Sequence, residues 1–159
     1  MTPGARLQAA IELVGVINTE TAPSDHLVRQ YFRTRRYIGS KDRRAITNRI
    51  WRVIRHRARL RWQLQNECPS PRLEVLADAL IYADDSLETV EAMCSGEAYT
   101  PGPITRDEHS ALLDAQRRSE SDAPVQVRVE CPDWLWPYMI DLYGVDAERE
   151  VSALNEEAP

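Results

Sequence analysis

The sequence contains only three cysteines, and their spacing fits neither a disulfide framework nor a metal cluster. Cys68, Cys94 and Cys131 are odd in number, and no two of them have C-x-x-C spacing. Disulfide frameworks and structural zinc sites need paired or clustered thiols, so both classes are disfavoured. We expect small thiols, buried or half-buried, in a reducing cytoplasm.

Long apolar stretches are missing as well. No run approaches the roughly 20 residues that span a bilayer. The N-terminus also lacks the charged region, apolar core and small-residue cleavage site of a signal peptide. We therefore expect a cytoplasmic protein that has no membrane partner.

Motifs for catalysis or metal binding are absent too. No H-E-x-x-H occurs, and the three histidines stand apart in the sequence. His56 is expected to pack or cap rather than to act as a general base. The sequence thus predicts no catalytic residue, no metal ligand and no cofactor in this chain.

Helical periodicity, in contrast, runs through most of the 159 residues. Apolar residues recur at three- and four-residue spacing, and Ser, Thr and Pro mark helix starts. Thr2 followed by Pro3 suits the start of a first helix, and Thr105 to Glu108 reads as a capping box. Helices are expected from about 3 to 17, 24 to 34, 41 to 65, 71 to 81, 86 to 94, 106 to 118, 133 to 143 and 146 to 154.

Strand patterns are nearly absent. Residues 126–130 alternate enough to predict one short extended piece, and Pro137 is expected to kink or shorten the helix that contains it. A polar break, "SESDAP", separates the main run of helices from the last part of the chain. We predict an all-α fold, with a helical bundle over residues 1–120 and a short helical linker or extension over 121–159.

Charge is distributed unevenly along the chain. Residues 29–61 hold thirteen Lys/Arg and one acid, Asp42, which is a charge of +12, whereas the remaining residues carry −17. Twelve of the thirteen bases are arginine, whose planar guanidinium pairs with phosphate and stacks on bases. A chain polarised in this way presents a basic face to an anionic partner.

Within the helix expected at 41–65, apolar and basic residues fall on opposite faces of a helical wheel. The core stripe consists of Ile46, Ile50, Val53, Leu60 and Leu64. The opposite face is a ladder of Arg44, Asn48, Arg52, Arg55 and Arg59, flanked by Trp51 and Trp62.

No acid interrupts this ladder, although stacked like charges at i, i+4 spacing cost a few tenths of a kcal/mol each. The pattern favours contact with a polyanion, and the neighbouring aromatic residues favour RNA. An acidic protein surface and plain solvation are the alternatives. Arg57 falls on the apolar stripe instead, where it needs either a paired acid or a path to the edge of the bundle.

The segment "RRYIGSKDRR", residues 35–44, leads into this helix. It is not a Walker loop, because Gly39-Ser40-Lys41 lacks both the second glycine and a preceding strand. We expect a turn, with Ser40 as the helix cap, whose cations and free backbone N–H groups form an anion site. RNA contacts are predicted for Arg33, Arg35, Arg36, Lys41, Arg43, Arg44, Asn48, Arg52, Arg55 and Arg59.

Residues 37–60, "YIGSKDRRAITNRIWRVIRHRARL", resemble the NusB-like N-terminal domain of the bacterial 16S rRNA cytosine-C5 methyltransferases, the Fmu/Sun/RsmB family. In that family a Y/F-I/L-G-S-x-D-R-R segment leads into a helix that ends in V/L-x-R-H-R-x-x-L. The opening "TPGARLQAAIELV" is similar to the family's first helix, and "PDWLWPYMIDLYG" and "ALNEEAP" resemble its linker. Family motif positions match at Arg43, Arg44, Arg55, His56 and Arg57.

The resemblance implies a NusB-like helical bundle that binds ribosomal RNA and positions it for a catalytic domain. Its partners would be ribosomal RNA and the methyltransferase domain of its own chain, and S-adenosylmethionine would be bound by that domain. The chain stops at Pro159 and has neither the glycine-rich cofactor loop nor the Pro-Cys and Thr-Cys motifs of the family. Cys94, in Met-Cys-Ser-Gly, lacks the proline of such a motif. We therefore expect an accessory domain without enzymatic activity of its own, whose parent protein is an rRNA methyltransferase.

Two alternatives stay open at this point. The chain could be a free-standing antitermination protein that binds RNA together with a protein partner, or a structural module whose basic face docks on its own enzyme.

Overall fold

The helices begin where capping side chains meet apolar runs. The Thr2 hydroxyl accepts a hydrogen bond from the Ala5 amide at 3.1 Å, and Pro3 occupies the first turn. Ser70 accepts from the Leu73 amide in the same way, again ahead of a proline. The predicted capping box is present, with Thr105 and Glu108 each accepting from the other's amide. Each cap satisfies donors that a helix leaves without partners in its first turn.

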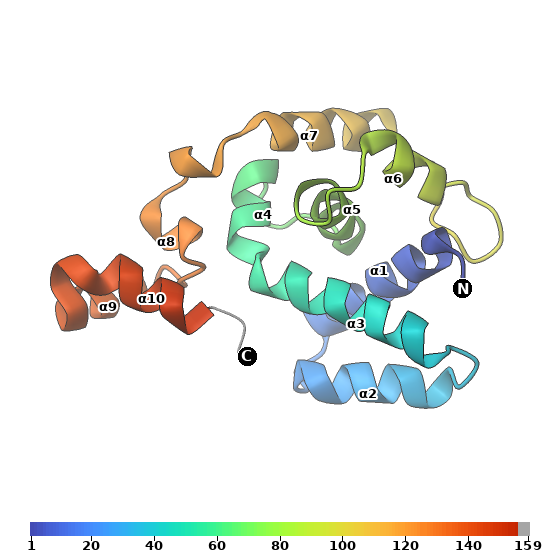
Figure 1. The fold of residues 1–159 in the computed structure, drawn as a ribbon, viewed down its shortest axis with the longest axis horizontal. Helices are drawn as coiled ribbons and strands as arrows, with labels where there is room; N and C mark the ends of the chain where they lie inside the picture. The colour runs from blue at the N-terminus through green and yellow to red at the C-terminus, as the bar shows by residue number, and fades with distance from the viewer. Residues whose placement is uncertain (156–159) are drawn as a thin grey trace.

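The computed structural model describes residues 1–155, and Figure 1 shows their arrangement. The predicted all-α class is confirmed, since no strand occurs within this range. The α-helices are α1 (Pro3–Thr19), α2 (Ser24–Thr34), α3 (Ser40–Arg55), α4 (Arg57–Leu64), α5 (Pro71–Ile81), α6 (Leu87–Met93), α7 (Arg106–Arg117), α8 (Val125–Arg128), α9 (Trp136–Tyr143) and α10 (Ala147–Asn155). Two 3₁₀ turns, η1 (Glu120–Asp122) and η2 (Gly144–Asp146), join the last of them.

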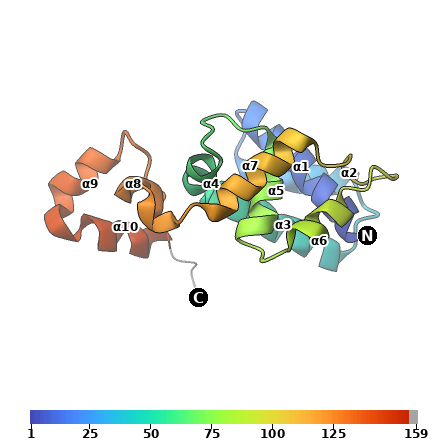
Figure 2. The same cartoon turned by 90° about the horizontal axis from the view of Figure 1, so that it is seen from above.

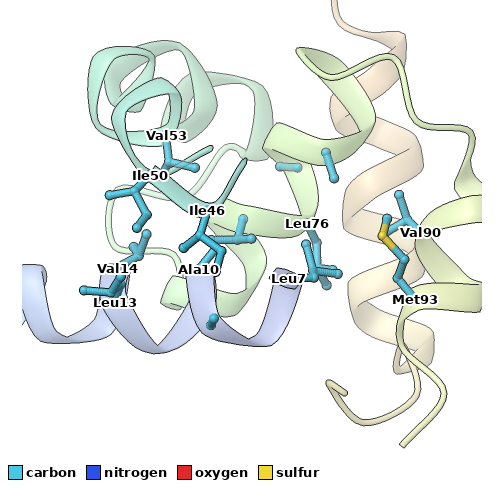
Figure 3. Close-up of a cluster of buried hydrophobic side chains, with 14 of the residues drawn as sticks. Leu7, Ala10, Leu13, Val14, Ile46, Ile50, Val53, Leu76, Val90 and Met93 are labelled. Atoms are coloured by element: carbon cyan, nitrogen blue, oxygen red, sulfur yellow. The ribbon is translucent and has the colours of Figure 1, made fainter. Parts of the chain in front are cut away.

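The main core lies where α1, α3 and α5 meet (Figure 3). All five residues of the predicted stripe, Ile46, Ile50, Val53, Leu60 and Leu64, are buried there. From α1 they meet Leu7, Ala10, Leu13 and Val14, and from α5 they meet Leu76. Burial of these side chains supplies most of the stabilisation of the bundle.

A second, smaller cluster of buried residues holds the last helices together. Val129, Cys131 and Val151 form its centre, with Leu135, Trp136 and Met139 around them. Figures 1 and 2 show α8, α9 and α10 at one end of the molecule, with α8 beside α4. The boundary expected after residue 120 stays a prediction, and residues 156–159 of the expected linker lie outside the described residues.

Three local predictions are wrong. The residue that caps α3 is Gly39, in an extended conformation, and Ser40 is the first helical residue. Residues 126–130 are not extended, because α8 and the turn after it occupy them. The expected shortening at Pro137 is confirmed, since α9 begins at Trp136 rather than at 133 and Pro137 lies in its first turn, where its missing N–H costs nothing. Cys68 is exposed, whereas Cys94 and Cys131 are buried as expected.

Candidate nucleic-acid interface

The basic helix predicted at 41–65 is two helices, with a break at His56. Its backbone, at φ −100° and ψ 23°, ends α3 and precedes α4. The Glu130 carboxylate accepts hydrogen bonds from the amides of Ala58 and Arg59, at 3.0 and 3.2 Å, in the first turn of α4. This contact comes from a residue about 70 positions away, so helical periodicity could not predict the break.

The His56 ring packs in the bend rather than facing solvent. It stacks on the Tyr82 ring with a centroid separation of 4.5 Å. Burial, reinforced by the nearby Arg59 guanidinium, lowers the pKa of His56. A neutral, stacked imidazole fits the packing role that the sequence predicts.

Arg52 is an ion-pair partner within the bundle, and its predicted contact with RNA stays a prediction. Its guanidinium donates to both oxygens of Asp78, at 2.7 and 2.8 Å, and the Asp78 side chain is completely buried. Arg49 lies beside the same carboxylate and donates to Asp85 at 3.3 Å. The acids belong to α5 and the loop after it, so the wheel of α3 alone could not show them.

Arg59 is likewise paired within the fold. Its guanidinium lies 3.4 Å from Glu130 and 3.5 Å from Glu120. Burial raises the pKa of Glu130 to about 7, although the two backbone hydrogen bonds and Arg59 act in the opposite direction. Tyr82 also donates to Glu120, at 2.6 Å. The cluster joins α4 and α5 to the segment that leads into α9.

The acid required by Arg57 is Glu74 of α5. The Arg57 Nε lies 3.5 Å from the buried Glu74 carboxylate, and its Nη2 donates to Asn18 at 2.7 Å. Asn18 in turn donates to Glu74 at 3.3 Å. Arg61 lies 4.0 Å from the same carboxylate. Arg57 therefore pairs with a buried acid inside the bundle.

Two arginines of the α2–α3 turn hold the turn itself. Arg43 Nε donates to the Ile38 carbonyl at 2.8 Å, which ties the start of α3 to the loop. The Arg35 guanidinium lies 3.7 Å from the centre of the Tyr31 ring and 3.6 Å from the Glu12 carboxylate. Both side chains are half-buried, and their contacts stabilise the conformation of the turn.

Four other cations at this turn extend into solvent without an acidic partner. Among residues 1–155, no ion pair or hydrogen bond involves their side chains, and no side chain caps the first turn of α3. Asp42 is occupied by the N-terminal ammonium and Arg6, which lower its pKa, and the Glu12 carboxylate lies beside Arg35. We call these four residues the turn cluster: Arg33, Arg36, Lys41 and Arg44.

The remaining predicted contacts lie farther along α3. Asn48 and Arg55 are both exposed, and their predicted contact with RNA stays a prediction. Trp51 packs against the main core and Trp62 is half-buried, so neither ring stands free beside the ladder. The exposed aromatic residue of this region is Tyr37, which lies within the turn.

Comparison with known proteins adds no relative. No family model, no curated protein and no solved structure matches the chain. Within residues 1–155, no group of three His, Cys, Asp or Glu residues is placed to hold a metal ion, and no helix is long and apolar enough to cross a bilayer.

Proposed function

We propose that this chain is an RNA-binding accessory domain of an S-adenosylmethionine-dependent 16S rRNA cytosine-C5 methyltransferase, and that it positions ribosomal RNA for a catalytic domain. The proposal rests chiefly on the turn cluster. Four exposed cations surround one turn, and within residues 1–155 none of them has an acidic partner. Of the acids near the turn, Asp42 pairs with the N-terminal ammonium and Arg6, and Glu12 pairs with Arg35. The sequence motif over residues 37–60, which includes this turn, supports the ribosomal substrate.

The proposed interface is smaller than the ladder predicted from the helical wheel. Arg52 and Arg59 are excluded because buried carboxylates bind them. The turn cluster lies at the N-terminus of a sixteen-residue helix, where the helix dipole adds to the attraction for phosphate. Arg35 and Arg43 support the turn and present part of their charge to the same ligand.

Methyl transfer would be the task of the catalytic domain, which would also bind S-adenosylmethionine. The present sequence has no glycine-rich cofactor loop after a strand and no Pro-Cys or Thr-Cys nucleophile motif. Methyl transfer to rRNA by this chain alone would contradict the proposal.

The C-terminal helices offer a surface for that domain. Exposed apolar side chains concentrate between residues 134 and 145, and such patches are typical of protein interfaces. They are Trp134, Tyr138, Ile140, Leu142, Tyr143 and Val145. A purified catalytic domain of this methyltransferase family should slow amide hydrogen exchange in α9, and unchanged exchange would argue against this docking.

The decisive test is titration with an rRNA fragment over a range of salt concentrations. If each cation of the turn cluster contacts one phosphate of a single strand, log Kobs should fall with log salt concentration with a slope of about −3. The combined variant Arg36→Glu, Lys41→Glu and Arg44→Glu should lose most of the affinity and most of the slope.

A matched control reverses three exposed arginines outside the turn. Arg106→Glu, Arg117→Glu and Arg149→Glu change the net charge by the same amount. They should reduce RNA affinity only slightly. Equal losses in the two triple variants would show that net charge alone determines binding, and would reject the turn cluster as the interface.

A further inference from the structure

A pocket of about 580 Å³ opens directly beside the turn cluster. It is enclosed by α1, the α2–α3 turn and the loop around residue 99. Figures 1 and 2 place that turn and the loop after α6 on the same side of the molecule, close to the N-terminus. We infer that this pocket accepts one unstacked base of the bound RNA and favours bases that carry an exocyclic amino group. The inference deepens the proposed function and rests on it.

The floor of the pocket suits the flat, weakly polar face of a base. Ala5 and Ala9 of α1 and Ile38 of the turn line it, and all three are buried. Its volume falls in the range of small-ligand sites in proteins. Small side chains on α1 leave this space open, since a larger residue at either alanine would fill it.

Two tyrosines stand at the rim of the pocket. Tyr37 is 76% exposed and Tyr99 is 84% exposed, so neither ring is used in packing the core. Tyr99 also has a φ of 69°, a left-handed conformation that is unfavourable for a residue with a side chain. Exposed aromatic rings at such positions are the platforms on which single-stranded bases stack.

A carboxylate supplies the polar group of the pocket. Glu12 accepts hydrogen bonds from the Tyr31 hydroxyl at 2.9 Å and from the Gln8 amide at 3.2 Å, and the Arg35 guanidinium lies 3.6 Å from it; these contacts orient the carboxylate. Its free acceptor positions suit the amino group of cytosine, adenine or guanine. The two carbonyl oxygens of uracil would face the same negative charge, so uracil should bind less well.

Positive charge lies on the chain immediately before and after the rim. Arg36 precedes Tyr37, and Lys41 follows four residues later, both exposed and without acidic partners in the described chain. A nucleotide with its base in the pocket would therefore have its phosphates near the turn cluster. This complementarity identifies the occupant as single-stranded RNA rather than a neutral ligand.

The experiment compares three oligomers of about ten units, a length typical of single-stranded sites: oligo(C), oligo(U) and an abasic phosphate chain. The native protein should bind oligo(C) about tenfold more tightly than the abasic chain, and severalfold more tightly than oligo(U). Tyr37→Ala with Tyr99→Ala should remove the advantage over the abasic chain. Leu154→Ala, at an exposed apolar position on α10, is the control and should leave it unchanged.

Glu12→Gln tests the choice of base. Glutamine keeps an oxygen for the Tyr31 hydroxyl, so the fold is retained, but the negative charge that disfavours uracil is lost. The ratio of oligo(C) to oligo(U) affinity should fall to within about twofold. Glu20→Gln, at the exposed end of α1, should keep the native ratio.

The outcomes separate the two proposals. If the native protein binds all three oligomers equally and the turn-cluster variant binds none, the base pocket is rejected and RNA binding by the turn cluster stands. If no oligomer and no rRNA fragment binds, both proposals fail. Loss of binding to the abasic chain in the tyrosine variants would also reject the pocket, because that chain has no base to stack.

Discussion

Arg52 donates to both carboxylate oxygens of Asp78, and it thereby joins α3 to α5 within the bundle. Asp78 is completely buried, and Arg52 is its hydrogen-bonded counter-charge, with Arg49 farther away at 4.0 Å. We predict that Arg52→Met lowers the free energy of unfolding by about 3 kcal/mol, the cost of leaving a buried charge without its partner. Urea unfolding should show this loss, whereas Arg44→Met, at an exposed position, should change stability by about 0.5 kcal/mol or less.

We expect the opposite ranking for RNA affinity, which Arg44→Met should reduce more than Arg52→Met. Arg44→Met is expected to weaken binding to an rRNA fragment severalfold, because a phosphate contact is lost. Arg52→Met should bind normally at temperatures where it remains folded. An equal loss of RNA affinity in both folded variants would support RNA contact by Arg52 as well as by Arg44, as the helical wheel predicts. It would contradict the smaller interface proposed above.

Glu130 makes stability depend on pH. Burial raises the pKa of its carboxyl to about 7 in the folded chain, above the value of 4.5 for an unperturbed glutamate. The folded state then binds more protons than the unfolded state between these two values. This contribution is fully present below about pH 4.5, and it is lost as the pH rises through 7.

The expected size of this effect is on the order of 3 kcal/mol. It is measured by determining the free energies of unfolding of the native protein and of Glu130→Gln at several pH values and following how their difference changes with pH. Glutamine cannot ionise, but it keeps an acceptor for one of the two backbone amides in α4. A native protein whose stability rises with pH relative to the glutamine variant would show that the ionised carboxylate is the preferred form.

Two glycines of α1 should respond in opposite ways to alanine. A Cβ at Gly4 would lie 2.5 Å from the Met93 carbonyl oxygen and 2.9 Å from Thr100 Cγ2. Gly4→Ala should therefore destabilise the protein by about 1–3 kcal/mol and displace the loop that carries Tyr99.

At Gly15 the nearest atom to a new Cβ is 3.8 Å away, in the Pro71 ring. Gly15→Ala should stabilise the helix by about 0.5–1 kcal/mol. Thermal unfolding of both variants checks the pair, and a neutral Gly4→Ala would mean that α1 and the loop are not packed as closely as the structure shows.

The sequence was sufficient to predict features that depend on neighbouring residues in the chain. Helix starts at Thr2, Ser70 and Thr105 follow from short capping patterns. The buried stripe from Ile46 to Leu64 follows from helical spacing, and it persists across the bend because α4 packs against the same core. Such local signals survive folding because tertiary packing uses the same faces.

The division of the arginines could not be predicted in this way. Arg44 and Arg52 lie on the same face of one wheel, yet one is exposed and the other binds a buried acid. The difference arises from α5, whose Glu74 and Asp78 face α4 and α3. An acid at a core-facing position of the helix expected at 71–81 is the sequence signal that could have indicated such an ion pair.

The pocket was not predicted either. Its residues come from three separate segments, and Glu12 and Tyr99 carry no motif that connects them.

Glu74 and Asp78 are one helical turn apart on α5, and they pair with arginines on two different helices. If α5 slid by a single turn, at least one acid would be stranded in the interior without a counter-charge. The two pairs thus fix the position of α5 along α3 and α4. Glu130 fixes the segment before the C-terminal helices to the start of α4 in the same way. In the proposed enzyme, the scaffold would act as a stiff spacer that holds the captured nucleotide at a constant distance from the reacting centre.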